Sequence, residues 1–167
     1  MNKVQEMLIK MLKRNKFFEK MSDEQLLKFS NLFKLEMATK GQAIIIEWHQ
    51  PENIYILKKW KLVAKKAHWL NTIVLWEVWE WEVFGEMSFF HKQPAMASVV
   101  CESDTCNYWS ISRDAFEKFL EENPEVKTQI AETLAKREKE NKEKLWWWLD
   151  LHPSNTENKI DDIEINL

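Results

Sequence analysis

Gly85 and the residues after it offer the clearest chemistry in the chain, which has only 2 glycines. Glycine lets the backbone approach a ligand closely, and the amides of the turn behind it can bind an anion through aligned N–H dipoles. Glu86 follows directly, although a glutamate in solvent would give the same tripeptide with Phe84. The segment therefore indicates an anion-binding turn whose significance depends on the elements around it.

No other constellation of reactive side chains stands out. The four histidines lack the close spacing of a metal site, so we expect no metal. They are His49, His68, His91 and His152. No nucleophile with a base partner and no lysine-bearing phosphate loop is present, so we expect no enzyme and no required cofactor. Cys101 and Cys106 form neither a disulfide framework nor a zinc pattern, and we interpret them as buried free thiols.

The composition is that of a globular domain. The chain has 167 residues, 45% hydrophobic and 31% charged, with a net charge of -3. This length suits one domain of about 100–150 residues with short extensions. The charge gives no reason to expect nucleic acid, and no apolar run reaches the roughly 18 residues of a membrane span. The charged N-terminus lacks a signal-peptide core, so we expect a cytoplasmic protein.

Helices are expected on both sides of a central segment. Apolar residues from Val4 to Leu12 recur at helical spacing and predict an N-terminal helix within residues 1–16. A capping box of Ser22 and Gln25 predicts a second helix that ends near residue 33. Ser112 is a good N-cap for a third helix, and Pro124 starts a final helix that runs to about residue 145. Residues 146–167 are expected to form a flexible acidic tail.

The central segment is expected to be all β. Short runs rich in Ile, Val, Leu and Phe alternate with turn-like residues, which is typical of strands. They cover residues 44–46, 54–57, 62–64, 72–75, 83–84, 97–100 and 108–111. Seven such strands are enough for a closed or sandwich-like antiparallel barrel. We therefore predict a mainly β fold with flanking helices, a jelly-roll-like barrel over a domain of residues 17–145.

This order of elements resembles the cyclic-nucleotide-binding domain, found in Crp-type regulators and in protein kinase A regulatory subunits. The resemblance covers residues 17–140 and rests on a phosphate-binding cassette: Phe-Gly-Glu, a short helical turn, then Pro-Arg and a strand of small residues. In this chain the cassette positions are Phe84, Gly85, Glu86, Met87, Ser88, Ala95, Met96, Ala97 and Ser98. The resemblance implies that these nine residues line a ligand site.

The resemblance also implies a role for each part of the cassette. Gly85 and the amides after it would approach the cyclic phosphate, and Glu86 would take the ribose 2′-hydroxyl. The family arginine pairs with the phosphate oxygens, but Ala95 stands at its position here. The implied ligand is cyclic AMP, cyclic GMP or a related small anion. Ala95 puts ordinary high-affinity binding in doubt.

Tryptophan occupies positions where such a domain has turn glycines. A chain of this length should have about 12 glycines, and this one has 2 glycines and 10 tryptophans. The tryptophans at expected turns or hinges are Trp48, Trp60, Trp69, Trp79, Trp81 and residues 146–148. A residue with a Cβ at positive φ costs on the order of 1–2 kcal/mol. We therefore hypothesise that the gene uses UGA as a glycine codon; the alternative is a genuinely tryptophan-rich surface that stacks on a ligand or partner.

Two function classes remain open. In the first, the domain senses a small anionic ligand and relays its binding through the final helix to an effector protein. In the second, a degenerate barrel binds no nucleotide and acts as an interaction or dimerisation module through that helix. The family often carries a DNA-binding helix-turn-helix, but the residues after Leu145 are too few for one. The short apolar stripe of Val126, Ile130 and Leu134 predicts a monomer or weak homodimer.

Overall fold

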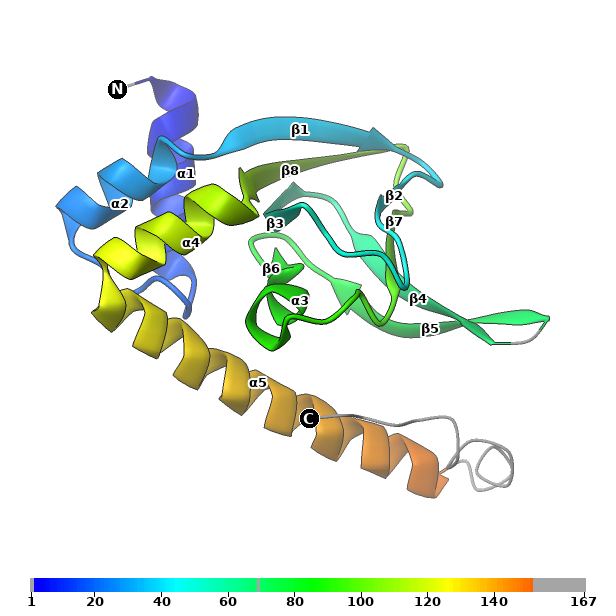
Figure 1. Ribbon diagram of the computed structural model, residues 1–167. Coiled ribbons are helices and arrows are strands. Elements are labelled where there is room, and N and C mark those ends of the chain that lie inside the picture. The colour runs from blue at the N-terminus through cyan, green and yellow to red at the C-terminus, as the bar shows by residue number, and fades with distance from the viewer. Residues whose placement is uncertain (1, 69, 152–167) are drawn as a thin grey trace. The chain divides into compact units, whose positions relative to one another are not determined.

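The computed structural model of the chain describes residues 2–68 and 70–151 (Figure 1). Its contacts divide the chain into two units, Met1–Ala131 and Glu132–Leu167. In the part that the structure describes, no helix is both long enough and apolar enough to cross a membrane. The first unit holds all the strands and every position of the predicted ligand site.

Two N-terminal helices form where the capping residues predict them. Helix α1 (Lys3–Arg14) follows Asn2, whose side chain accepts a hydrogen bond from the Gln5 amide at 2.8 Å. Helix α2 (Asp23–Ser30) follows Ser22, and the predicted capping box with Gln25 is present. The α2 residue Phe29 is fully buried and packs on four further phenylalanine rings. These are Phe18, Phe33, Phe116 and Phe119.

Eight antiparallel strands form two four-stranded sheets, in the orders β1-β8-β3-β6 and β2-β7-β4-β5 (Figure 1). Their bounds are β1 (Lys34–Thr39), β2 (Ala43–Ile45), β3 (Asn53–Lys59), β4 (Leu62–His68), β5 (Asn71–Val78), β6 (Val83–Phe84), β7 (Ser98–Cys101) and β8 (Thr105–Ser112). The predicted antiparallel β fold is confirmed. Strand pairing among the described residues leaves the two sheets separate, so of the two predicted forms, closed or sandwich-like, the structure has the sandwich-like one.

Side chains from both sheets meet in one apolar cluster, which we call the inner cluster. Its members are Ala38, Ile45, Tyr55, Leu57, Leu62, Ala64, Val78, Phe84, Ala95, Ala97, Val99, Cys101, Cys106 and Tyr108. Strand residues contribute at every second position, as in Leu62 and Ala64 of β4, because successive side chains of a strand point to opposite faces. The cluster therefore shows which face of each strand points inward.

One strand and one helix end differ from the sequence prediction. Strand β1 was not predicted as a strand of its own, because only Ala38 in it is buried and Met37 is 59% exposed, so no apolar alternation marks it. It pairs along its whole length with β8. After α4 (Arg113–Glu122), helix α5 (Pro124–Leu151) continues past the expected end near residue 145 and includes positions 146–148. The rest of the predicted tail, residues 152–167, lies outside the described residues.

Three tryptophans adopt the backbone conformation that the glycine hypothesis requires. Trp48, Trp60 and Trp81 have φ of 66°, 76° and 73°, in the left-handed region that favours glycine. Trp76 and Trp109 lie in β5 and β8 instead, where no turn requires glycine. The buried indole N–H of Trp109 finds no hydrogen-bond partner among the described residues. Trp69 lies outside the described residues. The φ values support the hypothesis at the three turns.

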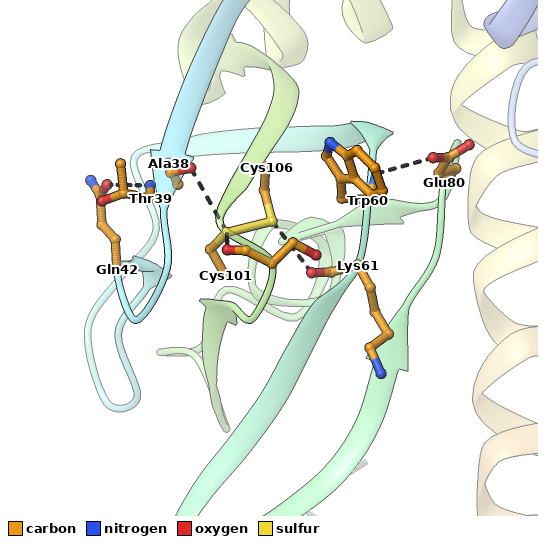
Figure 2. Close-up of a disulfide and its surroundings, with 9 residues drawn as sticks. Ala38, Thr39, Gln42, Trp60, Lys61, Glu80, Cys101 and Cys106 are labelled. Carbon is orange, nitrogen blue, oxygen red and sulfur yellow. Dashed lines mark hydrogen bonds between the residues drawn. A yellow bond between two sulfur atoms is a disulfide. The ribbon is translucent and has the colours of Figure 1, made fainter.

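The two cysteines are joined, which corrects their interpretation as free thiols. Cys101 of β7 and Cys106 of β8 form a disulfide with 6.0 Å between their Cα atoms (Figure 2). This pairing could not be predicted from the sequence, because two cysteines five residues apart can lie on one strand or across a hairpin. Here β7 belongs to one sheet and β8 to the other. The disulfide therefore links the two sheets at one end of the inner cluster.

Candidate functional site: the cassette between β6 and β7

Gly85 occupies a position that accepts no other residue without strain. Its φ is +84°, and it is the N-cap of the short helix α3 (Glu86–His91). A Cβ here would lie 3.2 Å from Ile45 Cδ1 and 3.3 Å from both the Asn53 carbonyl oxygen and Tyr55 Cδ2. Conformation and close packing therefore both require glycine, as the sequence pattern predicted.

The first half of the cassette is buried against β3. Phe84 of β6 pairs with Tyr55 and stacks on its ring, with 5.0 Å between the ring centroids. Glu86 is only 3% exposed and Ser88 only 8% exposed. Met87 between them is half-buried. A carboxyl group so far from bulk water at the start of a ligand-type turn suits a specific contact better than the solvated role that the tripeptide alone allowed.

The second half of the cassette is anchored by backbone hydrogen bonds and carries no charge. The Ala95 amide donates to the His49 carbonyl at 2.9 Å, and the Ala95 carbonyl accepts from the Trp48 amide at 2.8 Å. Ala95 and Ala97 are buried in the inner cluster, whereas Met96 is 41% exposed. The segment is therefore held in place, but the side chains of Ala95, Met96 and Ala97 supply neither a donor nor a positive charge.

Ser98 does not share the face of Ala97. Its hydroxyl accepts a hydrogen bond from the Glu47 amide at 2.9 Å, and Ser98 pairs with Lys65 across the β7–β4 ladder. Of the nine predicted residues, the structure brings Phe84, Ala95 and Ala97 together in the inner cluster. Gly85, Glu86, Met87 and Ser88 follow in the adjoining turn and α3, and Met96 and Ser98 are directed elsewhere.

Arg113, which the sequence analysis did not assign to the site, fastens the cassette to the rest of the domain. It is the first residue of α4, and its Nη1 donates to the Pro51 carbonyl at 3.3 Å. Its guanidinium lies 5.4 Å from the centroid of the Phe89 ring of α3. With its amide oxygen turned toward Arg113, Gln50 also accepts from Nη2 at 3.1 Å. Arg113 therefore holds α3 against the segment of Gln50 and Pro51.

Two tyrosines of the inner cluster keep their protons at neutral pH. Burial, with the Glu36 carboxylate adding to it, raises the pKa of Tyr108 to about 12. Burial also raises the pKa of Tyr55. A phenol in water has a pKa near 10, so both hydroxyls are neutral groups that can donate or accept a hydrogen bond.

Glu47 is a second buried carboxylate that the sequence analysis missed. It is 8% exposed, and its Oε2 accepts a hydrogen bond from the Ala67 amide of β4 at 2.9 Å. Its Oε1 finds no hydrogen-bond partner in the described part of the chain. A glutamate beside a turn gives no sequence signal of burial, because burial arises only when β2, β4 and β7 come together.

The comparisons with known proteins agree with this arrangement. The family model described as "Cyclic nucleotide-binding domain" matches residues 35–123, which is more than half of the chain and includes the whole cassette. The chain belongs to the cyclic nucleotide-binding domain family. A search of curated proteins finds no match.

Solved structures of the family share the fold of this domain. A cyclic nucleotide-binding domain from Methylobacillus flagellatus has a TM-score of 0.72 and 19% identity, covering 86% of this chain and 83% of that one. The regulatory domain of Toxoplasma gondii PKA, solved with cAMP, has a TM-score of 0.67 and 22% identity, covering 71% and 46%. The regulatory subunit of a cAMP-independent protein kinase A from Trypanosoma brucei has a TM-score of 0.71 and 19% identity, covering 87% and 51%.

The Trypanosoma brucei subunit has also been solved as a triple mutant, one of whose substitutions introduces an arginine, with cAMP in its A site. The chain spans about half the length of the kinase regulatory subunits that it matches. At these identities the likeness shows the fold, and the ligands belong to those proteins.

Proposed function

We propose that this domain is a regulatory module, not an enzyme, that binds a cyclic nucleotide or a related small anion at the cassette. The observation that carries the proposal is the Gly85 turn, where a left-handed backbone that requires glycine and a buried Glu86 lie next to each other in the family's order. The amides after Gly85 would face the phosphate, and Glu86 would accept from the ribose 2′-hydroxyl. Binding would then be relayed through α5 to an effector protein or a second copy.

Ala95 sets the affinity that this proposal expects. A hydrogen bond from a charged partner contributes roughly 1.5–3 kcal/mol, and each 1.4 kcal/mol is a factor of ten in the dissociation constant. A domain without the arginine should therefore bind about one to two orders of magnitude more weakly than one that has it. The arginine-bearing triple mutant of the Trypanosoma brucei subunit, which carries cAMP, supports this reasoning.

Calorimetry of three full-length proteins tests the proposal. The original chain, Ala95→Arg, and Ala95→Arg with Glu86→Ala are titrated with cyclic AMP and with cyclic GMP. We expect Ala95→Arg to bind about 10 to 100 times more tightly than the original chain. Adding Glu86→Ala should remove much of that gain, because the ribose contact is lost. If neither the original chain nor Ala95→Arg binds a cyclic nucleotide, the pocket is closed and the domain is an interaction module.

Assembly remains part of the same proposal. Val126 and Ile130 of the α5 stripe are buried, at 2% exposure each, so these residues are not available as a seam for a second helix. We therefore propose a monomer or a weak homodimer, which light scattering at micromolar and nanomolar concentrations would distinguish from a tight dimer.

A further inference from the structure

The cassette needs a source of positive charge, if the proposed function is correct and its ligand is an anion. Ala95 supplies none. Arg113 lies against α3, but its guanidinium already contacts the Pro51 carbonyl and the Phe89 ring. A cyclic phosphate transferred from water into a partly buried site without a cation would lose hydration that amides alone replace poorly. A cation that faces inward from the strands beside Ala95 would meet this need.

Three lysines lie in β4 or directly before it, and two of them already have carboxylate partners. Lys61 Nζ lies 2.8 Å from Glu77 Oε1, and Lys65 Nζ lies 2.7 Å from Glu102 Oε1. Lys66 has no such ion pair among the described residues, and the contact found for it is with the Trp48 ring. Of the three, Lys66 is the cation that a ligand could recruit.

The register of β4 against β7 places Lys66 on the inward face. Leu62 lies opposite Cys101 and Ala64 lies opposite Val99, with no shift between them, and all four residues belong to the inner cluster. Side chains alternate along a strand, so Lys66 shares the face of Leu62 and Ala64, while Lys65 shares the opposite face. The irregularity between Ala64 and Lys65 concerns the pairing with β5, and leaves the β7 ladder intact.

A second contact connects Lys66 to Ala95 through one intervening residue, Trp48. Its Nζ lies 5.7 Å from the centroid of the Trp48 ring. The Trp48 amide in turn donates to the Ala95 carbonyl at 2.8 Å, so residue 48 is the direct backbone neighbour of residue 95. β4 is paired with β7, the strand that follows the cassette (Figure 1). Register and contact therefore point to the same place.

We propose that Lys66 takes the place of the missing arginine and binds the negatively charged group of the ligand. A cation over an exposed aromatic ring is held weakly, whereas a charge-assisted hydrogen bond to a phosphate oxygen is stronger, so an arriving anion displaces the ring. Lysine acts as a point charge and cannot make the paired contact of arginine. The site is therefore adapted to a singly charged anion bound through one donor, at lower affinity than in arginine-bearing relatives.

The buried Glu47 makes this cation more necessary. Its carboxylate accepts from the amide of Ala67, the residue directly after Lys66, so a negative charge lies at the same end of β4. Without Lys66 that carboxylate would repel an anionic ligand across a poorly solvated region.

Calorimetry with a charged and a neutral probe tests the role of Lys66. The full-length chain, Lys66→Gln and the matched control Lys65→Gln are each titrated with cyclic AMP and with adenosine, which has the same base and ribose but no phosphate. We expect Lys66→Gln to weaken cyclic AMP binding about tenfold or more and to leave adenosine within about twofold. Lys65→Gln should change neither, and Lys66→Arg should retain cyclic AMP binding.

Three results would overturn the inference, and they are distinguishable. If Lys66→Gln binds cyclic AMP as the original chain does, the charge comes from another group. If Lys66→Gln loses affinity for cyclic AMP and for adenosine equally, Lys66 affects the shape of the site and does not bind the charged group of the ligand. If the original chain binds neither probe, the proposed function itself fails, and the role of Lys66 fails with it.

Discussion

Two sets of turns in this domain have the same backbone conformation but opposite side chains. Gly41 and Gly85 have φ of 83° and 84°, and Trp48, Trp60 and Trp81 have φ of 66° to 76°. Glycine adopts this region without steric penalty, while a residue with a Cβ is strained there. The backbone conformation therefore favours glycine at all five turns, but glycine is present at only two of them.

The surroundings of the tryptophans do not explain their presence. Their rings are 70%, 48% and 36% exposed, in the order Trp48, Trp60 and Trp81. Each ring lies near one cation, at distances of 4.8 to 5.7 Å from the ring centroid. Such a contact contributes about 0.5–1 kcal/mol at an exposed site, which does not exceed the backbone strain. The difference between the two sets is thus one of residue identity, and substitution can test it.

The largest expected effect comes from restoring glycine at all three tryptophan turns. We compare Trp48→Gly, Trp60→Gly and Trp81→Gly, combined in one protein, with the corresponding triple alanine variant. Both lose the rings and their cation contacts, but only glycine relieves the backbone. At about 1 kcal/mol for each site, the glycine variant should be about 3 kcal/mol more stable than the alanine variant. Urea denaturation followed by circular dichroism measures the difference.

Equal stability of these two variants would contradict the glycine hypothesis at the turns. The gene gives an independent answer, since UGA at the ten tryptophan codons supports glycine and UGG excludes it. The exposed rings also predict that the glycine variant will associate less than the original chain, because fewer aromatic groups face solvent.

Much of the fold follows from local sequence patterns. The capping box at Ser22 and Gln25, the cap at Ser112 and the apolar strand runs all lie where the structure has those elements. These signals are local, so they can be read without knowing the partner strands. Strand β1 was missed because Ala38 is its only buried residue. The strand forms by pairing with β8, which is adjacent in space but far along the sequence.

The candidate site likewise has one part that the local sequence predicts and another that depends on strand pairing. The Gly85 turn was predictable, because a glycine and its neighbours carry the information within one segment. The inward position of Lys66 was not, because adjacent lysines at 65 and 66 look alike until the β4–β7 register assigns them to opposite faces. The disulfide of Cys101 with Cys106 was also beyond local reasoning, since it depends on β7 and β8 entering different sheets.

A second test compares the two native glycines with each other. Both have positive φ, but a Cβ at Gly41 would meet nothing within 4 Å, whereas at Gly85 it would press on the Asn53 carbonyl and two side chains. Gly41→Ala should lose about 1–2 kcal/mol of stability from the backbone alone. Gly85→Ala should lose about 1–2 kcal/mol more, because over-packing adds to the strain.

Thermal or urea denaturation of these two alanine variants gives both numbers. Equal losses would show that the cassette relaxes around a Cβ and that the close approach at Gly85 is unimportant for stability. A larger loss at Gly41 would mean that its turn is the more constrained one, which would reverse the order expected here.

The smallest expected effect is at Lys92, the fourth described residue with positive φ that is not glycine. It ends α3 with φ of 53° and ψ of 39°, close to the ideal left-handed values, in a position where helices often place glycine. The relief from Lys92→Gly is offset by the greater freedom of glycine in the unfolded chain, so we expect a gain below about 0.5 kcal/mol. Urea denaturation of Lys92→Gly beside Trp60→Gly and Trp60→Ala would measure it. If Lys92→Gly gained as much as glycine gains over alanine at position 60, then any residue at a left-handed turn would show the effect, and the tryptophan turns would not be a special set.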